Sequence, residues 1–177
     1  MMTRINLFKI IKERRSIRRY KEKEIPMEEI NKILEAGIYA PSAGNRQPWE
    51  FIIVRRNDNK KKLAEAAYNQ NWIMEAPVII VVCANINRTV IRYGERGRTL
   101  YCIQDTAAAI QNILLAAYTM GYGTCWIGAF NEQKVKEILN IPRDIRPVAL
   151  ITIGIPAEKP IPPPRTPLER LIHMEKY

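Results

Sequence analysis

Apolar residues recur along this chain in two patterns, and each pattern predicts one kind of element. In five stretches they return every three or four positions, the spacing of one helix face. In others, β-branched and apolar residues follow one another without alternation, as in strands buried on both faces. Helices are expected at 7–14, between Pro26 and Pro41, and at 60–70, 99–120 and 131–140. Strands are expected at 49–55, 77–84 and 146–156, with a short strand or extended loop at 124–130.

The expected helix at 99–120 is the longest, and its apolar residues cover most of its circumference. Leu100, Ile103, Ile110 and Leu114 form one stripe, and neighbouring alanines widen it. Such a helix must be buried from more than one side. Either it is the central core helix of a monomer or a partner subunit covers part of it, and the pattern leaves both possibilities open.

The elements lack the regular βαβ rhythm of a parallel sheet, which favours an α+β sandwich. The 177 residues suffice for one domain with a real core, and we expect a single domain over residues 1–177. Residues 157–177 contain closely spaced prolines, so they should follow an extended path. Ile161 and Leu168 indicate that this tail lies along a surface.

The longest apolar run, APVIIVVCA, has about half of the ~20 residues that a membrane-spanning helix needs. No long apolar segment typical of a signal peptide stands near the start. We therefore expect a cytoplasmic protein with no membrane partner.

The formal net charge is +10, with basic clusters at 9–23 and 55–62. Such charge attracts nucleic acid, anionic membranes or a phosphate-bearing small molecule, and charge alone does not choose among them. We expect Lys60, Lys61 and Lys62 to form a solvated face. Three cysteines without paired spacing and a single histidine argue against a disulfide framework, a metal site and a Ser-His-Asp triad. No catalytic side chain is therefore assigned.

The motif RRSIRRY, residues 14–20, places a serine among arginines. Guanidinium groups grip a phosphate with two parallel hydrogen bonds, so the motif suits a phosphate ligand. A basic surface turn and a nucleic-acid patch are the alternatives, although base stacking favours more aromatic residues than the one at Tyr20.

The stretch APSAGNRQPWEF, residues 40–51, sets small and amide side chains between two prolines. Ser42, Asn45 and Gln47 supply donors and acceptors, while Ala43 and Gly44 allow close approach of a ring. A planar heterocycle with several carbonyls and nitrogens matches this chemistry. The alternative is a helix-to-strand loop whose amides satisfy its own backbone.

The stretch GTCWIGAF ends in small residues, Gly128 and Ala129, that leave backbone N–H groups unobstructed. A backbone donor aimed at a ring nitrogen tunes a redox cofactor without an acid or base side chain. The alternative is a tight strand end. Asp105 is expected to begin a buried stretch or to pair with an arginine, rather than to donate a proton.

Together these segments resemble the FMN-dependent nitroreductase family. The resemblance is carried, in order, by RRSIRRY, APSAGNRQPWEF, DTAAAIQNILLAAYTMGYGTCWIGAF, RPVALITIGIP and PRTPLERL. It implies a nitroreductase-like sandwich with a central mixed sheet flanked by helices. It also implies an intertwined homodimer with one FMN in each of two interface pockets, and a tail that packs on the partner subunit.

The resemblance further implies which residues bind FMN. Arg14, Arg15, Ser16 and Arg18 would hold the phosphate and flank the ring, and Arg165 would return to the phosphate. The partner subunit would edge the isoalloxazine with Pro41, Ser42, Ala43, Asn45 and Gln47. The far side of the ring would be lined by Trp126, Ile127, Gly128 and Ala129. Asn69 and Asn71 match family contact positions only loosely.

The implied reaction is a ping-pong hydride transfer from NADH or NADPH, through FMN, to small aromatic or quinone-like acceptors. The alternatives are reductive dehalogenation or flavin breakdown on the same fold, or a basic nucleic-acid-binding module. Little chain lies between Ala84 and Thr99 to form a large lid, which favours an open acceptor site of broad specificity. The sequence does not rank the candidates for binding a 2′-phosphate, Arg88, Arg92, Arg96 and Arg98.

Overall fold

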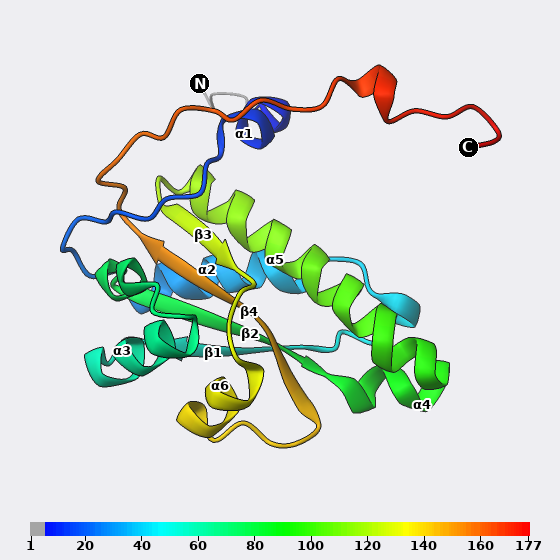
Figure 1. Cartoon of the computed structure of the whole chain (residues 1–177), viewed down its shortest axis with the longest axis horizontal. Coiled ribbons are helices and arrows are strands. Elements are labelled where there is room, and N and C mark those ends of the chain that lie inside the picture. Colours follow the sequence, from blue (N-terminus) through cyan, green and yellow to red (C-terminus); the bar gives the residue numbers. More distant parts are fainter. Residues whose placement is uncertain (1–5) are drawn as a thin grey trace.

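The computed structural model describes residues 6–177, and its centre is a four-stranded sheet with helices on both faces (Figure 1). The strands are β1 (Trp49–Val54), β2 (Val78–Asn85), β3 (Gly123–Ile127) and β4 (Ile145–Gly154). Their order is β1-β2-β4-β3, so β1 and β3 are the two edges. The α+β class is confirmed.

The expected mixed sheet is wrong for the described chain, because all three strand pairs are antiparallel. The chain enters each strand from the end opposite to its neighbour, which leaves no parallel pair. The one parallel contact in the described range is an isolated bridge between Ser16 and Thr124.

Apolar side chains pack on both faces of the sheet, as the unbroken apolar runs predict. Helices α2 (Met27–Ile38) and α5 (Cys102–Thr119) cover one face, where Ile33 and Ile113 join Ile80. Helices α3 (Asn57–Ala66) and α6 (Glu132–Leu139) cover the other, where Leu63 joins Val81. Cys83 is a buried core residue on this second face.

The helix ends follow local signals in the sequence. Helix α1 (Leu7–Glu13) begins after Asn6, whose side chain accepts a hydrogen bond from the Lys9 N–H at 3.2 Å. Helix α2 ends at Ile38, before Pro41. Helix α5 begins later than expected, because residues 97–101 form a π-helical turn first.

Helix α4 (Ile86–Arg96) is an element that the sequence pattern did not predict. Its buried or half-buried side chains, Ile86, Thr89, Val90 and Tyr93, form a short stripe at helical spacing, whereas Ile91 on the other side is 82% exposed. The helix also packs closely on the turn that follows it, because a Cβ on Gly97 would lie 2.7 Å from the Thr89 carbonyl oxygen.

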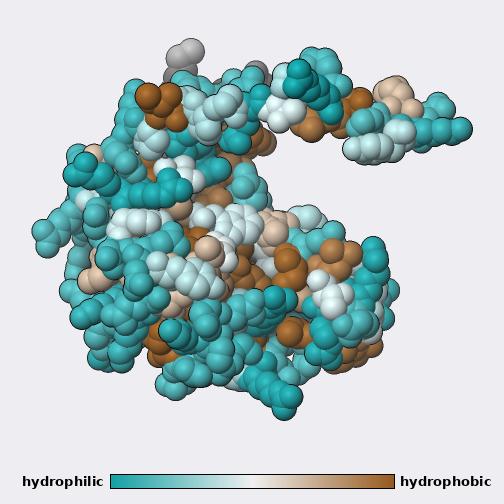
Figure 2. Space-filling model, in the orientation of Figure 1, coloured by the Kyte–Doolittle hydropathy of each residue, from teal (hydrophilic) through white to brown (hydrophobic). Residues whose placement is uncertain are grey.

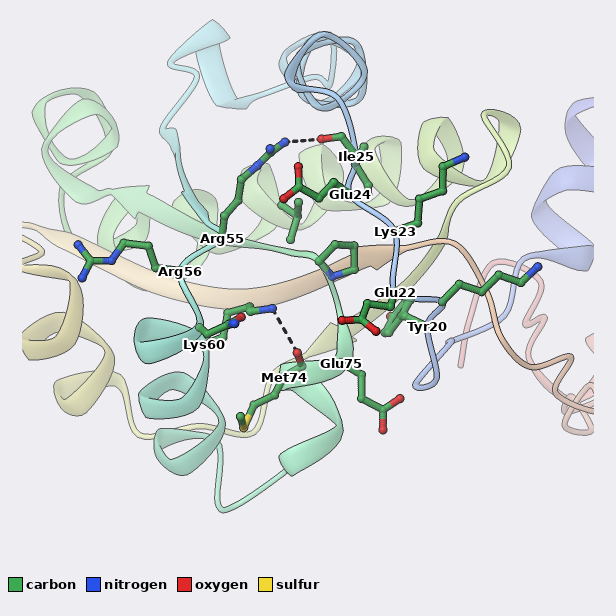
Figure 3. Close-up of a pocket in the computed structure, with 14 residues that line it drawn as sticks. Tyr20, Glu22, Lys23, Glu24, Ile25, Arg55, Arg56, Lys60, Met74 and Glu75 are labelled. Atoms are coloured by element: carbon green, nitrogen blue, oxygen red, sulfur yellow. Dashed lines mark hydrogen bonds between the residues drawn. The ribbon is translucent and has the colours of Figure 1, made fainter.

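Lys60 corrects the expectation of a solvated face, because its side chain is only 6% exposed (Figure 3). Its ammonium donates to the carbonyls of Met74 at 3.2 Å and Ala76 at 2.9 Å, and burial lowers its pKa. Lys61 and Lys62 are exposed, as expected. The long aliphatic stem of lysine makes such burial compatible with two carbonyl partners at its tip.

Residues 16–21 lie beside strand β3 and the end of β4. The Ile17 N–H donates to the Thr124 carbonyl at 2.9 Å, and the Ala157 N–H donates to the Arg19 carbonyl at 2.9 Å. From residue 161 onward the tail is exposed, and it projects from the body over a notch (Figures 1 and 2). Within residues 6–177, no helix is both long and apolar enough to cross a membrane.

We predict that Gly123→Ala destabilises the protein, because the added Cβ would lie 2.7 Å from Cγ1 of Ile17. Strand β3 is held by β4, so the segment that carries Ile17 must move, and overpacking of this kind costs about 1–3 kcal/mol. Urea unfolding of the flavin-free protein measures this loss. Gly128→Ala is the control, because no heavy atom lies within 4 Å of its added Cβ. Equal stability of the two variants would contradict the packing described here.

Candidate functional site

Guanidinium groups from both ends of the chain gather beside strand β3. Burial lowers the pKa of Arg14 most, and repulsion from Arg15 and Arg165 lowers it further, so the charges of these two arginines lie near enough to act on Arg14. No carboxylate within residues 6–177 forms an ion pair with any of them. No ion pair within residues 6–177 therefore balances the charge of the cluster, although Glu13 and Glu158 line the same cavity as Arg15.

The two predicted motifs RRSIRRY and GTCWIGAF meet at Cys125. Burial raises the pKa of this thiol, and the neighbouring Arg18, Ser16 and Arg14 oppose that shift in this order. The bridge between Ser16 and Thr124 sets the register of the two segments. The structure thus brings together residues more than 100 positions apart.

The end of β3 exposes mainly backbone and one aromatic side chain. Trp126 is 40% exposed, whereas the Ile127 side chain is buried in the core, so only its backbone is available there. Gly128 and Ala129 are exposed, and nothing lies within 4 Å of a Cβ on Gly128.

The turn before the 3₁₀ segment Asn71–Glu75 also borders this space, through a residue that the sequence analysis missed. The Gln70 side-chain amide donates to the carbonyls of Ala67 at 2.9 Å and Ala129 at 3.3 Å. The guanidinium of Arg18 lies 5.6 Å from the ring centre of Trp72. No spacing or composition signal marks Gln70, because its contact partner is a backbone carbonyl 59 residues away.

The loop between α2 and β1 is a tight turn that satisfies much of its own hydrogen bonding. The Ser42 hydroxyl accepts from the Gln47 N–H at 3.0 Å, and the Gln47 amide donates to Asn45 Oδ1 at 3.0 Å. Gly44, Asn45 and Gln47 all have positive φ angles, of 54°, 53° and 49°. Left-handed backbone at two residues that carry side chains is uncommon, and the neighbouring structure must hold it in place.

Side chains from α5 and α4 hold this loop. Asp105 is 7% exposed and accepts from the Ala43 N–H through Oδ1 at 3.0 Å; its Oδ2 is buried without a partner. It is buried as expected, but it forms no ion pair with an arginine. From α4, Arg88 donates to the Gln47 carbonyl at 2.8 Å, and the Tyr93 hydroxyl lies 2.4 Å from the position of a Cβ on Gly44.

The loop and the arginine cluster do not meet within one chain. The loop leads into β1, and the cluster lies beside β3, which are opposite edges of the sheet. Three strand spacings separate these edges, about 14 Å. Pro41, Ser42, Ala43, Asn45 and Gln47 are therefore separated from Arg14, Ser16 and Trp126.

A cavity of about 700 Å³ lies away from both groups, beneath residues 20–25 and beside α3 (Figure 3). It contains none of the predicted site residues, and its walls carry charges of both signs, including Arg55, Glu75 and Lys60. Among residues 6–177, no group of three or more side chains is placed to hold a metal ion.

The chain matches the sequence model of the Nitroreductase family over residues 11–73 and 64–155. A relative from Bacillus subtilis, named FMN reductase [NAD(P)H], is 33% identical, with 97% of this chain and 74% of the relative aligned. A relative from Thermus thermophilus, named NADH dehydrogenase, is 32% identical, with 90% of this chain and 91% of the relative aligned.

The solved structure of B. megaterium NfrA2 superposes on this fold with a TM-score of 0.90. The two chains are 30% identical, and the match covers 98% of this chain and 76% of the other. The sandwich arrangement expected from the sequence is thus found in a solved relative.

We predict that Asp105→Asn raises the free energy of unfolding at pH 7, because it removes a buried charge and keeps an acceptor for the Ala43 N–H. Burial raises the pKa of Asp105 in the folded protein. The stability that its protonation supplies is therefore present at low pH and lost as pH rises through the folded pKa. The advantage of the variant should shrink as pH falls toward 4.

Urea unfolding at several pH values, with the exposed Asp144→Asn as control, measures this effect. A stability gap that widens as pH falls would contradict the assignment. Asp105→Ala, which leaves the Ala43 N–H without its acceptor, should lose about 1–3 kcal/mol.

Proposed function

The chain belongs to the nitroreductase family and is an NAD(P)H-dependent flavin oxidoreductase, and we propose that its flavin is FMN, held between two copies of the chain. The observation that carries the proposal is the cluster of Arg14, Arg15 and Arg165. None of the three forms an ion pair with a carboxylate in the described chain, and burial, followed by repulsion from Arg15 and Arg165, lowers the pKa of Arg14. A phosphate is the counter-ion that guanidinium groups suit best.

The surroundings of the cluster fit the rest of an FMN molecule. Ser16 would add a hydroxyl donor at the phosphate, and Arg18 would flank the ring. The exposed indole of Trp126 and the backbone of residues 127–129 would line one side of the ring. Gly128 leaves open space there, so its backbone is free to approach a ligand.

The ring edge would come from residues 41–47 of a second copy. This loop is stiff, and within its own chain it lies at the sheet edge opposite the cluster. Pro41, Ser42, Ala43, Asn45 and Gln47 would offer the ring a small, polar border. Asp105 and Arg88 keep this border in place through the hydrogen bonds described above.

Exposed apolar residues support such a homodimer. Phe8 and Ile11 of α1 are exposed, and so are the tail residues Ile161, Leu171 and Met174. Figure 2 shows apolar side chains on the tail and around the notch beneath it. A chain that leaves so many large apolar groups in water has a surface suited to a partner, and we propose that residues 157–177 pack on the second subunit.

When bound, FMN supplies the redox chemistry, accepting hydride from NADH or NADPH and passing it to a small aromatic or quinone-like acceptor in two successive half-reactions. The residues of this chain bind the phosphate, orient the ring and leave one face open to both substrates. Between β2 and α5 the described chain has only helix α4 and the π-helical turn at residues 97–101, too few residues for a large lid. We therefore propose broad acceptor specificity.

Reductive dehalogenation, flavin breakdown and nucleic-acid binding gain no support from a specific contact in the described structure. The cytoplasmic location stays a prediction.

We predict that Arg14→Ala weakens FMN binding by tenfold or more, because it removes a charge-assisted contact to the phosphate. The same variant should bind riboflavin, which lacks the phosphate, almost as well as the unaltered protein does. Fluorescence titration of both flavins measures the difference. Arg143→Ala, at an exposed arginine beyond α6, is the control. Equal losses for both flavins, or full retention of FMN, would sink the phosphate assignment.

We also predict that the purified protein is yellow, is bleached by NADH or NADPH, and has twice the 20.5 kDa mass of one chain. Light scattering coupled to gel filtration gives the mass, and absorbance under anaerobic conditions gives the bleaching. A colourless protein that takes up no added FMN would refute the flavin assignment, and a monomer that retains FMN would refute the shared pocket.

A further inference from the structure

Four arginines lie on α4 or just after it, and the structure separates them by what they contact. They are Arg88, Arg92, Arg96 and Arg98. Arg88 donates to the Glu50 carboxylate at 2.7 Å, and Arg98 pairs with Glu95 at 3.4 Å. The charge of each of these two is already balanced by an acidic neighbour.

Arg96 and Arg92 differ from each other in hydrogen bonding. Arg96 donates through Nε to the Tyr101 hydroxyl at 2.9 Å. Arg92 has no ion pair and no side-chain hydrogen bond to any of residues 6–177, and its guanidinium lies 5.5 Å from the ring centre of Tyr93. The residue is exposed, so its guanidinium donors are available to a ligand.

The position of Arg92 is set by the loop that precedes β1. A Cβ on Gly44 would lie 3.3 Å from Nη1 of Arg92 and 2.4 Å from the hydroxyl of Tyr93. Arg92 thus stands directly beside residues 41–47. Under the proposed function, this loop edges the ring on which the nicotinamide must lie.

NADPH differs from NADH only in a 2′-phosphate at the adenosine end. With the nicotinamide on the flavin, the adenosine end would extend over the protein surface next to the loop. Helix α4 forms that surface, because its residues Arg88 and Tyr93 lie against the loop. A planar guanidinium binds such a phosphate through two parallel charge-assisted hydrogen bonds. We propose that Arg92 binds the 2′-phosphate and makes NADPH the preferred hydride donor, an inference that rests on the proposed function.

Arg46, in the loop itself, is the alternative candidate for binding the 2′-phosphate. It too lacks an ion pair within the described chain, but it is half-buried and its Nε is enclosed without a partner. An exposed guanidinium group is more accessible to the 2′-phosphate of an incoming NADPH than a partly enclosed one.

The test compares kcat/KM for NADPH and NADH in the dimeric, FMN-loaded enzyme. Arg92→Ala should lower the NADPH value by about tenfold to a hundredfold and the NADH value by less than threefold, the effect of losing one charge-assisted contact. Arg92→Lys should retain part of the preference. Arg98→Ala, whose partner is Glu95, should leave the ratio unchanged.

Competitive inhibition by two small probes isolates the phosphate. The inhibition constant of 2′,5′-ADP should rise about tenfold or more in Arg92→Ala, while that of ADP should stay the same. An unchanged NADPH/NADH ratio, or a ratio that falls in Arg46→Ala instead, overturns the inference and leaves the proposed function intact. If neither NADH nor NADPH reduces the bound flavin of the unaltered enzyme, both the proposed function and the inference about Arg92 fail.

Discussion

Uncompensated positive charge beside strand β3 is the constraint from which the rest of the account follows. The hydrogen bond between Ile17 and Thr124 lays the arginine-rich segment along this strand. The tail then brings Arg165 to Arg14, where repulsion and burial both disfavour the charged state. None of these arginines forms an ion pair in the described chain, so the cluster suits an anionic ligand, and the proposed ligand is a flavin phosphate.

Because of the strand order in the sheet, one chain supplies only half of the proposed pocket. Arginines and β3 stand at one edge, and the stiff loop before β1 stands at the other. Asp105 and helix α4 hold that loop in a strained backbone shape. Within one chain the loop has no contact with the arginine cluster at the other edge of the sheet. A strained loop so far from the arginines of its own chain is explained if it borders the FMN that a second copy of the chain holds.

The sequence predicted the parts of the fold that depend on buried apolar periodicity. Strand β2 is an example, because all of its residues but Asn85 are buried. Helix α5 is another, because its apolar residues Ile110, Ile113 and Leu114 pack in the core. Lys60 escaped prediction because two carbonyl partners override its polar composition. Helix α4 escaped prediction because its inward stripe is short and polar residues surround it. Motif reading also named the residue groups of the proposed site, but not Gln70 or the loop supports, whose contacts are to backbone atoms or to an unpredicted helix.

The shared pocket is tested most directly by mixing two defective chains, one with Arg14→Ala and one with Gly44→Val, which cannot keep a turn at φ 54° beside Tyr93. If each pocket takes its arginines from one chain and its loop from the other, a mixed dimer combines both defects in one pocket and leaves the second intact. The account predicts that refolding the two variants together restores FMN binding to about half of the mixed dimers' sites. No restoration, from variants that each still dimerise, would show that both elements act within a single chain and would contradict the account.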